Sequence, residues 1–255
     1  MKRKIHIASC SFGKDSIATI LLALENNEPL DRVVFSEVMF DHEKGISGEI
    51  PEHIEWIYNI AIPKLESMGV KVDVVRGKID YVSLCRRVLK SGKKKGKMYG
   101  LQSARFCFAN SECKIAPIRE YYKKFNKDYD VVQYVGIAID EPKRLARLKK
   151  NQISLLAKYG YTEKMAMSKC EEYDLVSPNY REGGGELRGG CWFCYNAHIK
   201  RYVNIRNKYP DYWNAIRELY YETNTKEFKY NKTLEEVERE MDAFEYEKEN
   251  QLELF

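Results

Sequence analysis

The sequence has no long hydrophobic run. No apolar stretch approaches the roughly 20 consecutive residues that a helix needs to cross a bilayer. The N-terminus passes from the mainly basic Met1–Lys4 directly into "IHIAS", so it lacks the apolar length of a signal peptide. We therefore expect a cytoplasmic protein with no membrane partner. With 255 residues, 44% hydrophobic and 32% charged, the chain is long enough for one large globular domain or two small ones.

A disulfide framework is not expected either. The chain has seven cysteines, and the cytoplasm keeps thiols reduced. Metal ligation, catalysis and simple burial are the uses that remain open for them. The four histidines show no ligand spacing and add no candidate metal site.

Charge is distributed unevenly along the chain. The net charge is +5, but residues 232–255 carry nine acidic and three basic residues, a net −6 that leaves +11 for the rest. Seven of the twelve residues in 86–97 are basic. A second basic cluster consists of Lys143, Arg144, Arg147, Lys149 and Lys150. This pattern favours an anionic substrate or a nucleic acid, although charged runs are also typical of a solvated surface.

Strand-like and helix-like segments alternate in the first half of the chain. The strand-like runs are 4–9, 32–40, 70–76 and 130–138, and the helix-like runs are 16–27 and 51–69. Strands separated by helices imply βαβ crossovers, so we expect an α/β fold with a doubly wound parallel sheet. We expect this α/β domain over residues 1–160, a mostly helical cap over 161–231 and an acidic helix or tail over 232–255.

The segment that links the first strand to the first helix has what a phosphate site needs. Gly13 lets the backbone approach a ligand closely, and Lys14 adds a positive charge. Hydroxyl donors are offered by Ser9, Ser11 and Ser16. The N–H groups that open the following helix lack intrahelical partners and carry the positive end of its dipole. The segment is neither a Walker A loop nor a dinucleotide-binding G-x-G-x-x-G. A plain strand-to-helix turn capped by Asp15 or Ser16 is the alternative.

This segment resembles the PP-loop, S-G-G-x-D-S, of the adenine-nucleotide alpha-hydrolase superfamily. It reads Ser11-Phe12-Gly13-Lys14-Asp15-Ser16, with Phe12 in place of the first glycine. Blocks downstream resemble the phosphoadenosine phosphosulfate (PAPS) reductase family in the same order. They are "VMFDHEKGISGEIPEHIEWI", "ARFCFANSECKIAPIREYY", "VGIAIDEPKRLARL" and "RGGCWFCYNAHIKRYVNIRNKYPDYW". The chain is thus similar to PAPS reductase-like members of the PP-loop superfamily, and also to the DNA phosphorothioation sulfurtransferases.

The resemblance implies an adenine nucleotide, ATP or PAPS, bound together with Mg²⁺. The positions that it assigns to nucleotide binding are Ser9, Ser11, Phe12, Gly13, Lys14, Asp15, Ser16, Gly136 and Arg144. It assigns the chemistry to Lys14, Asp15 and Asp41, with Asp15 or Asp41 positioning Mg²⁺. Arg144 follows the fourth strand, where sheet topology places ligands, and a guanidinium suits a phosphate or sulfate.

Four cysteines fall into two clusters. Cys107 and Cys113 are separated by five residues, and Cys191-x-x-Cys194 begins 78 positions after Cys113. Four such thiolates suit a tetrahedral zinc site or an iron–sulfur cluster, and buried thiols with a redox Cys-x-x-Cys pair are the alternative. The resemblance favours a [4Fe-4S] cluster over Zn²⁺, although the family's upstream pair is adjacent. Cys10 lies beside a helix N-terminus, which lowers the pKa of a thiol.

No cysteine follows Cys194. Sulfonucleotide reductases of the resembling family use a nucleophilic cysteine near the C-terminus, and the tail "EYEKENQLELF" has no equivalent. The resemblance therefore implies an ATP pyrophosphatase and sulfurtransferase, which releases AMP and pyrophosphate and activates a nucleic acid or a small molecule for sulfur transfer. A thiol or a cysteine desulfurase would donate the sulfur. A sulfonucleotide reductase with an external thiol and a non-catalytic nucleotide-binding component of a nucleic-acid or defence complex stay open, as does a homo-oligomer.

Overall fold

The structure is a computed structural model that describes residues 2–93, 95–102, 107–181 and 190–252. By its internal contacts the chain divides into two compact units, each assembled from three stretches. Unit 1 comprises Met1–Glu37, Glu49–Gly77 and Lys114–Gly189, and unit 2 comprises Val38–Gly48, Lys78–Cys113 and Gly190–Phe255. This division differs from the expected boundaries at residues 160 and 231, because each unit draws on both halves of the chain.

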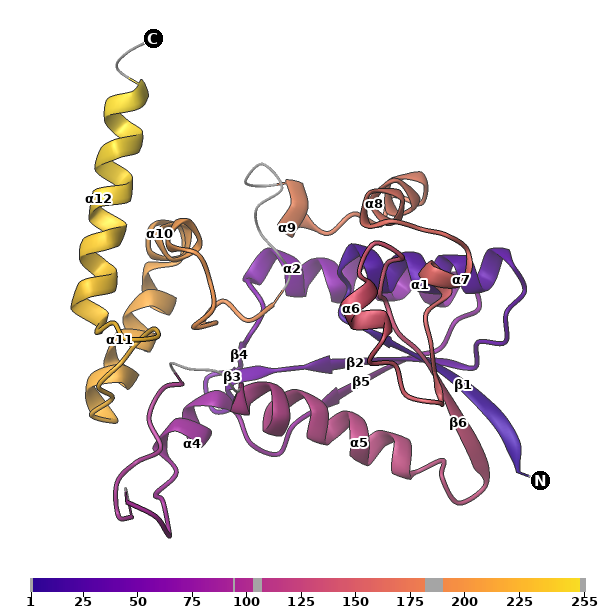
Figure 1. Ribbon diagram of the computed structural model, residues 1–255, viewed down its shortest axis with the longest axis horizontal. Helices are drawn as coiled ribbons and strands as arrows, with labels where there is room; N and C mark the ends of the chain where they lie inside the picture. Colours follow the sequence, from indigo (N-terminus) through magenta and orange to yellow (C-terminus); the bar gives the residue numbers. More distant parts are fainter. Residues whose placement is uncertain (1, 94, 103–106, 182–189, 253–255) are drawn as a thin grey trace. The chain divides into compact units, whose positions relative to one another are not determined.

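Unit 1 is built on a parallel sheet with the strand order β5-β2-β1-β6-β7 (Figure 1). The central β1 (Arg3–Cys10) pairs with β2 (Arg32–Glu37) and with β6 (Tyr129–Tyr134). The edges are β5 (Val72–Arg76) and the two-residue β7 (Gln152–Ile153). All four pairings are parallel, so the predicted α/β sheet is confirmed. The sequence did not reveal β7, because two residues are too short to show a period.

Helices cover both faces of this sheet (Figure 1). One face is covered by α1 (Lys14–Glu25), against which α7 (Leu155–Lys158) and α8 (Glu163–Glu172) pack. The other face is covered by α5 (Ala116–Lys123). Unit 1 also contains the short helices α6 (Pro142–Leu145) and α9 (Pro178–Arg181). Because α1 is enclosed between the sheet and other helices, eight consecutive residues of it, 16–23, are buried.

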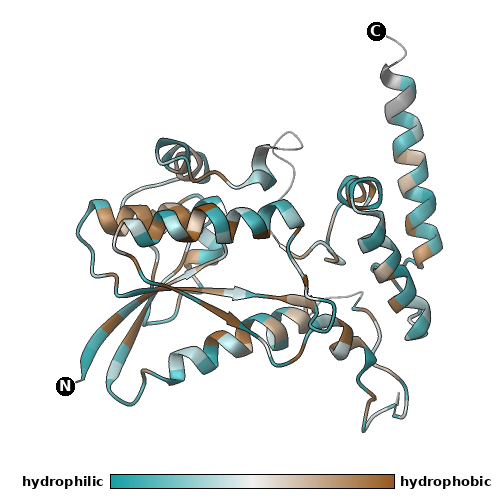
Figure 2. Ribbon diagram, turned by 180° about the vertical axis from the view of Figure 1, so that it is seen from behind, coloured by the Kyte–Doolittle hydropathy of each residue, from teal (hydrophilic) through white to brown (hydrophobic). Residues whose placement is uncertain are grey.

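The central strand supplies side chains to two separate cores. Ile5 and Ile7 pack with residues of α5, whereas Ala8 and Cys10 pack with residues of α1. This alternation follows from the two-residue period of a strand, which points successive side chains to opposite faces. Figure 2 shows the strands largely in brown, as expected for a sheet that is buried on both sides.

The helix expected over 51–69 is interrupted. It runs as α2 (Pro51–Trp56), a π-helical turn η1 (Ile57–Ala61) and α3 (Ile62–Ser67). Pro63 explains the interruption, because proline has no backbone N–H to donate and its ring collides with the carbonyl four residues earlier in a regular α-helix. The wider turn of η1 accommodates the proline without ending the helix.

Unit 2 contains a small antiparallel sheet and most of the C-terminal helices. β3 (Met39–Asp41) pairs with β4 (Ile46–Ser47). The strand predicted over 32–40 is therefore wrong as a single element, because it ends at Glu37 and β3 belongs to another sheet. Phe40, at the centre of β3, packs in an aromatic core against Trp192, with ring centroids 4.5 Å apart and the rings tilted.

Unit 2 also contains several helices. They are α4 (Tyr81–Arg86), α10 (Ile199–Lys208), α11 (Pro210–Glu222) and α12 (Leu234–Leu252), and the π-helical η2 (Ala109–Ile115) precedes α5 in the chain. The expected C-terminal helices are confirmed, including the acidic one, which is largely teal in Figure 2. Over the described ranges, no helix combines the length and the apolar character that a membrane span requires.

Candidate functional site

The loop between β1 and α1 is organised around Ser16. Its hydroxyl donates to the carbonyl of Gly13 (2.9 Å) and accepts the backbone N–H of Ser11 (3.2 Å). The backbone N–H of Ser16 donates to the same Gly13 carbonyl at 3.1 Å. Gly13 is therefore the N-cap of α1, and neither Asp15 nor Ser16 takes that position. The loop holds its own shape through internal hydrogen bonds.

Phe12 takes a backbone conformation that favours glycine. Its φ angle is +55°, in the left-handed region that other residues seldom adopt. The side chain is 0% exposed and packs edge-on against Phe35 (centroids 5.2 Å apart) and Trp56 (6.5 Å). This burial offsets the roughly 1–2 kcal/mol that the left-handed conformation costs. Phe12 therefore anchors the loop in the core, and only its backbone is available to a nucleotide.

Gly136 brings a second backbone segment against the loop. It follows β6, and a Cβ atom at this position would lie 2.7 Å from the carbonyl carbon of Asp15 and 2.8 Å from the nitrogen of Ser16. Both neighbours are backbone atoms, which cannot move aside as a side-chain end can. The close approach of this segment to the loop therefore requires glycine at position 136.

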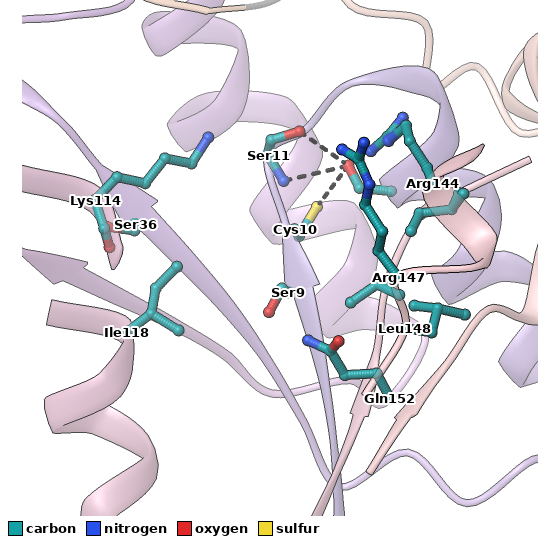
Figure 3. A pocket seen from close by; sticks show the side chains of 14 residues that line it. Ser9, Cys10, Ser11, Ser36, Lys114, Ile118, Arg144, Arg147, Leu148 and Gln152 are labelled. Carbon is teal, nitrogen blue, oxygen red and sulfur yellow. Dashed lines mark hydrogen bonds between the residues drawn. The ribbon is translucent and has the colours of Figure 1, made fainter. Parts of the chain in front are cut away.

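A pocket of about 480 Å³ lies where β1, β2 and β6 end (Figure 3). It is lined by Ser9, Cys10, Ser11, Ser16, Ser36, Lys114, Ile118, Val135, Gly136, Ile137, Arg144, Arg147, Leu148 and Gln152. The structure thus brings together five of the predicted nucleotide-binding residues, Ser9, Ser11, Ser16, Gly136 and Arg144. A site beyond the carboxyl ends of parallel strands is where open α/β sheets bind ligands.

Three basic side chains line this pocket, and they differ in their partners. Arg144 is held by Glu141, whose carboxylate oxygens accept at 2.5 and 2.7 Å. Arg147 and Lys114 have no acidic partner among the described residues. Sequence reasoning gave neither of these two a role at the nucleotide. Arg147 was one member of a basic cluster, and Lys114 lies in a motif that the resemblance quoted, but only the fold brings them to one pocket.

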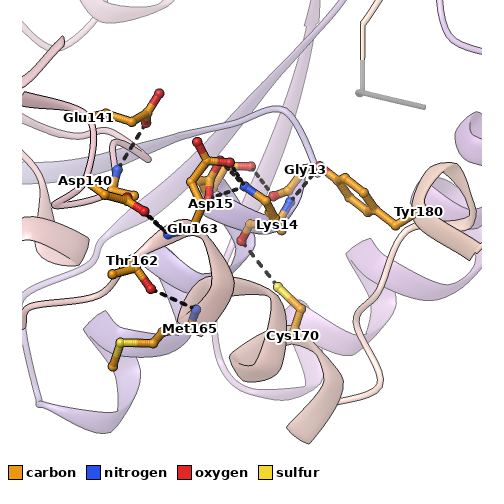
Figure 4. A network of polar contacts seen from close by, with 12 residues as sticks. Gly13, Lys14, Asp15, Asp140, Glu141, Thr162, Glu163, Met165, Cys170 and Tyr180 are labelled. Atoms are coloured by element: carbon orange, nitrogen blue, oxygen red, sulfur yellow. Dashed lines mark hydrogen bonds and ion pairs between the residues drawn. The ribbon is translucent and has the colours of Figure 1, made fainter. Parts of the chain in front are cut away.

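Lys14 is committed to a different network (Figure 4). Its ammonium group donates to Asp15 (2.9 Å) and to Glu163 at the start of α8 (2.7 Å). Burial alone would lower the pKa of Lys14, but the hydrogen bonds to the two carboxylates outweigh it and raise that pKa. For Asp15, burial raises the pKa and the hydrogen bond with Lys14 opposes the rise. Neither residue lines the pocket in this state, and their predicted catalytic roles stay predictions.

Tyr180 in α9 also contacts the loop (Figure 4). Its hydroxyl accepts the backbone N–H of Lys14 at 3.3 Å and would lie 3.1 Å from a Cβ at Gly13. One of the N–H groups that opens α1 is thereby satisfied by a side chain. Sequence reasoning missed both Tyr180 and Glu163, because they lie 166 and 149 positions from Lys14 in the chain.

Asp41 belongs to unit 2, unlike the loop. It ends β3 and is buried, and its Oδ1 atom accepts the backbone N–H groups of Glu43 (2.9 Å) and Lys44 (3.1 Å). In unit 2 this carboxylate organises the turn between β3 and β4. Its predicted role in positioning Mg²⁺ stays a prediction.

The four predicted metal ligands all lie in unit 2. Cys113 is buried, and Cys107, Cys191 and Cys194 are half-buried. The N–H of Cys194 donates to the carbonyl of Cys191 at 3.1 Å, so the Cys-x-x-Cys segment forms a turn. Burial raises the pKa of Cys113 to about 12, and Cys107 lies near enough to contribute to the rise.

Both cysteine clusters adjoin the ring of Tyr81. Phe193, inside the Cys-x-x-Cys turn, stacks on Tyr81 with ring centroids 4.1 Å apart. The Cys107 and Cys85 thiols also act on Tyr81, whose pKa is raised mainly by burial. The thiols suit zinc or an iron–sulfur cluster, but within the described ranges no three cysteine, histidine or carboxylate side chains are close enough to hold a metal ion. The metal site stays a prediction. Arg105, two residues before Cys107 in the quoted segment "ARFCFANSECKIAPIREYY", lies outside the described residues.

Cys10 does not have the low pKa expected from its place beside the N-terminus of α1. Its thiol is buried, and burial raises its pKa to about 11, although Ser16 and the N–H of Phe12 act in the opposite direction. The desolvation of a thiolate outweighs the helix dipole here. Cys10 therefore packs under the loop at the edge of the pocket, and the low pKa expected for it is not supported.

His53 lies beneath the loop and was not expected there. It is 0% exposed, its Nδ1 atom lies 2.9 Å from the hydroxyl of Ser177, and its Nε2 atom lies 3.9 Å from Glu49. Burial lowers the pKa of His53, while Glu49 and the backbone of Ser11 act in the opposite direction. A neutral imidazole therefore supports the loop from the side of the core.

No family model matches the sequence, and no curated protein matches it either. Among solved structures, the chain is similar to the U34-tRNA thiolase NcsA from Methanococcus maripaludis, solved with its [4Fe-4S] cluster. The sequences are 15% identical, the TM-score is 0.42, and the match covers 88% of this chain and 72% of that chain.

Proposed function

We propose that unit 1 binds the phosphates of ATP in the pocket beside the β1–α1 loop and cleaves ATP to AMP and pyrophosphate. The observation that carries this proposal is the position of Arg147 and Lys114, two basic side chains that have no acidic partner among the described residues and that line the same pocket as the loop serines. Cations without a counter-ion in a concave site favour an anionic ligand, since a bound phosphate supplies the missing charge. The volume of about 480 Å³ is in the range of nucleotide and cofactor sites.

The proposed reaction is a substitution at the α-phosphorus. An oxygen of the acceptor attacks that phosphorus, the bond to the bridging oxygen of the β-phosphate breaks, and pyrophosphate leaves with the electron pair. The adenylated acceptor is then attacked by a sulfur nucleophile, and AMP leaves. Donors at the β1–α1 loop, together with Arg144, Arg147 and Lys114, would stabilise the charge that accumulates on the departing phosphates.

Lys14, Asp15 and Asp41 are the residues proposed for the chemical step. Lys14 would reach a phosphate after its ion pairs with Asp15 and Glu163 open, and the freed Asp15 carboxylate would help to position Mg²⁺. Asp41 is the alternative carboxylate for that ion. The replacement Glu163→Gln tests this step, because a weaker hold on Lys14 is expected to raise the nucleotide affinity or the turnover rather than lower it.

The cysteines of unit 2 are proposed to hold the cofactor of the sulfur chemistry. Cys107, Cys113, Cys191 and Cys194 would ligate a [4Fe-4S] cluster, with Zn²⁺ as the alternative, and a cluster would supply a site that binds sulfur. Iron and zinc analysis after anaerobic purification, together with the visible absorption spectrum, tests this assignment. A colourless protein that contains zinc, or no metal at all, would contradict the cluster.

Incubation of the protein with Mg²⁺ and α-labelled ATP tests the proposed reaction. With no acceptor present, water attacks the α-phosphorus in its place, so we expect labelled AMP and an equal amount of pyrophosphate. Both products should be strongly reduced in Arg147→Gln and retained in Lys150→Gln, which changes an exposed lysine outside the pocket lining. Release of sulfite from PAPS in the presence of a thiol, without AMP formation from ATP, would show a sulfonucleotide reductase instead. Tight ATP binding with no product of either kind would show a non-catalytic nucleotide-binding protein.

A further inference from the structure

The basic run of residues 86–97 forms the greater part of an antiparallel hairpin in unit 2. Val88 bridges to Met98, and the strands are joined by hydrogen bonds from Leu89 to Lys97 (2.9 Å) and from Tyr99 to Arg87 (2.8 Å). Gly92 and Gly96 take φ angles of +80° and +82° at the tip, which glycine adopts without strain. We call residues 87–99 the basic hairpin; Lys94 within it lies outside the described residues.

Two arginines fix the base of the hairpin. The Arg87 guanidinium donates to both carboxylate oxygens of Glu112 (2.7 and 2.9 Å) and lies over the ring of Tyr99. Arg86, just before the hairpin, makes a paired contact with Glu222 (2.7 and 2.8 Å). These two arginines stabilise unit 2 through their ion pairs, which agrees with a solvated surface. The ion pairs do not account for the lysines of the hairpin.

The described lysines of the hairpin have no such use. The exposed ones that the structure describes are Lys90, Lys93, Lys95 and Lys97. Across the described part of the chain, none of these four makes an ion pair or a hydrogen bond through its ammonium group. By contrast, Lys158 and Lys169 each contact a glutamate. Four like charges on one short hairpin repel one another, so folding stability does not account for them.

An exposed aromatic ring adjoins the base of the hairpin. Phe108 is 41% exposed and contacts Tyr99 edge-on, with ring centroids 5.0 Å apart. Because Tyr99 is itself held by Arg87, Phe108 is supported on one side while part of its surface remains open to solvent. Cations beside a fixed aromatic ring are the combination with which proteins bind single-stranded nucleic acids, through phosphate contacts and base stacking.

The distribution of apolar side chains argues against a membrane surface as the partner. The described residues at the tip, residues 91–93 and 95–96, are serine, glycine and lysine only. The exposed apolar side chains, Val88 (53%) and Met98 (38%), lie at the base. A segment that inserts into a bilayer interface carries its apolar groups where it enters the lipid, which is not the arrangement here.

We propose that the basic hairpin docks the backbone of a single-stranded nucleic acid, with Phe108 stacking on a base. This inference deepens the proposed function, because it names a nucleic acid as the class of acceptor. It rests on the proposed function only in identifying the docked nucleic acid as the acceptor. The docking itself depends on the lysines and Phe108 of unit 2. Loss of ATP cleavage would therefore leave it unaffected.

The test is fluorescence anisotropy with a labelled single-stranded RNA of about 20 nucleotides, measured between about 50 and 200 mM salt. The variant is K90Q/K93Q/K95Q/K97Q. The matched control is K4Q/K71Q/K123Q/K127Q, which removes four other exposed lysines, all in unit 1. The hairpin variant is expected to lose at least 10-fold in affinity and to reduce the slope of log Kd against log salt by about 3, since each phosphate contact contributes roughly 0.7. The control variant is expected to change the affinity less than 3-fold.

A second variant tests the aromatic ring. Phe108→Ala is expected to weaken binding about 10-fold while leaving the salt slope unchanged, because stacking releases no counter-ions. Equal losses in the hairpin and control variants would overturn the proposal, as would the absence of RNA binding by the unaltered protein. Binding to vesicles with 30% phosphatidylserine but not to RNA would point to a membrane instead. Unchanged ATP affinity in the hairpin variant separates this result from a failure of the nucleotide site.

Discussion

The two basic clusters look alike in the sequence and differ in their surroundings in the structure. The cluster that contains Arg144 and Arg147 follows β6 and reaches a pocket of about 480 Å³ lined with serines. The basic hairpin extends its lysines into solvent from a base held by Arg87 and Glu112. A concave site limits its ligand to a small anion, whereas an open row of cations suits a long polyanion. The difference shows that a cluster of like charges predicts the charge of the ligand, while the fold around the cluster predicts the size of the ligand.

The largest expected effect concerns how the loop beside the pocket is held. Phe12→Ala removes a fully buried ring from the core, and we expect it to lower the free energy of unfolding by about 3–5 kcal/mol. Arg87→Gln, at the base of the hairpin, removes a surface ion pair and is expected to cost at most about 1 kcal/mol. Urea denaturation of both variants measures the difference. Similar losses in the two variants would mean that the loop is not anchored by its core contact.

Gly136→Ala is expected to have the next largest effect, and mainly on nucleotide binding. The added Cβ would lie 2.7 Å from the Asp15 backbone, so the loop has to shift away from the pocket. We expect the ATP affinity to fall about 100-fold, equivalent to roughly 3 kcal/mol. Isothermal titration calorimetry measures this, and anisotropy with RNA provides the internal control. A parallel loss of RNA affinity would show that the two clusters do not act separately.

Arg147→Gln removes one of the two pocket cations for which the described ranges contain no acidic partner. A hydrogen bond to a charged group contributes about 1.5–3 kcal/mol, so the ATP affinity is expected to fall about 10- to 100-fold, at the lower end if water replaces the contact. Little change in thermal stability is expected, because Arg147 has no acidic partner among the described residues. Lys150→Gln serves as the control. An affinity that is unchanged in Arg147→Gln would place the phosphates elsewhere.

The smallest expected effect is a pH dependence confined to unit 1. Burial lowers the pKa of His53 below its ordinary value of 6.5, so the folded protein favours the neutral ring, and the unfolded chain takes up a proton first as the pH falls. Stability is therefore expected to be constant above about pH 7 and to decline below pH 6.5. Urea midpoints from pH 5 to 8 should show this decline, and His53→Gln should flatten it. RNA docking should stay constant over the same range, because lysines remain protonated.

The sequence was sufficient to locate the four longer strands of the main sheet. β1, β2, β5 and β6 each overlap a run rich in apolar residues, as expected for strands of a parallel sheet that helices cover on both faces. The position of Gly136 could be predicted from its motif, and the structure supplies the reason, a backbone contact with Asp15. Local composition was enough in these cases.

Contacts between distant parts of the chain could not be predicted. The pairing of Lys14 with Glu163 joins residues 149 positions apart, and neither residue type indicates the other. The division into two units has the same origin, because the chain returns to each unit from separate stretches. Cys10 shows the third limit: its place beside a helix N-terminus suggested a low pKa, and its burial, which raises that pKa, depends on the whole core.

Hydrogen–deuterium exchange with mass spectrometry tests the central claim most directly, because it locates both ligands in one protein. With saturating ATP and Mg²⁺, we expect protection of the amides in residues 9–17 and 135–148 and none in the basic hairpin. With single-stranded RNA, we expect protection of residues 87–99 and of the segment around Phe108, with the β1–α1 loop unchanged. Protection of the hairpin by ATP, or of the loop by RNA alone, would contradict the assignment of the two basic clusters to different ligands.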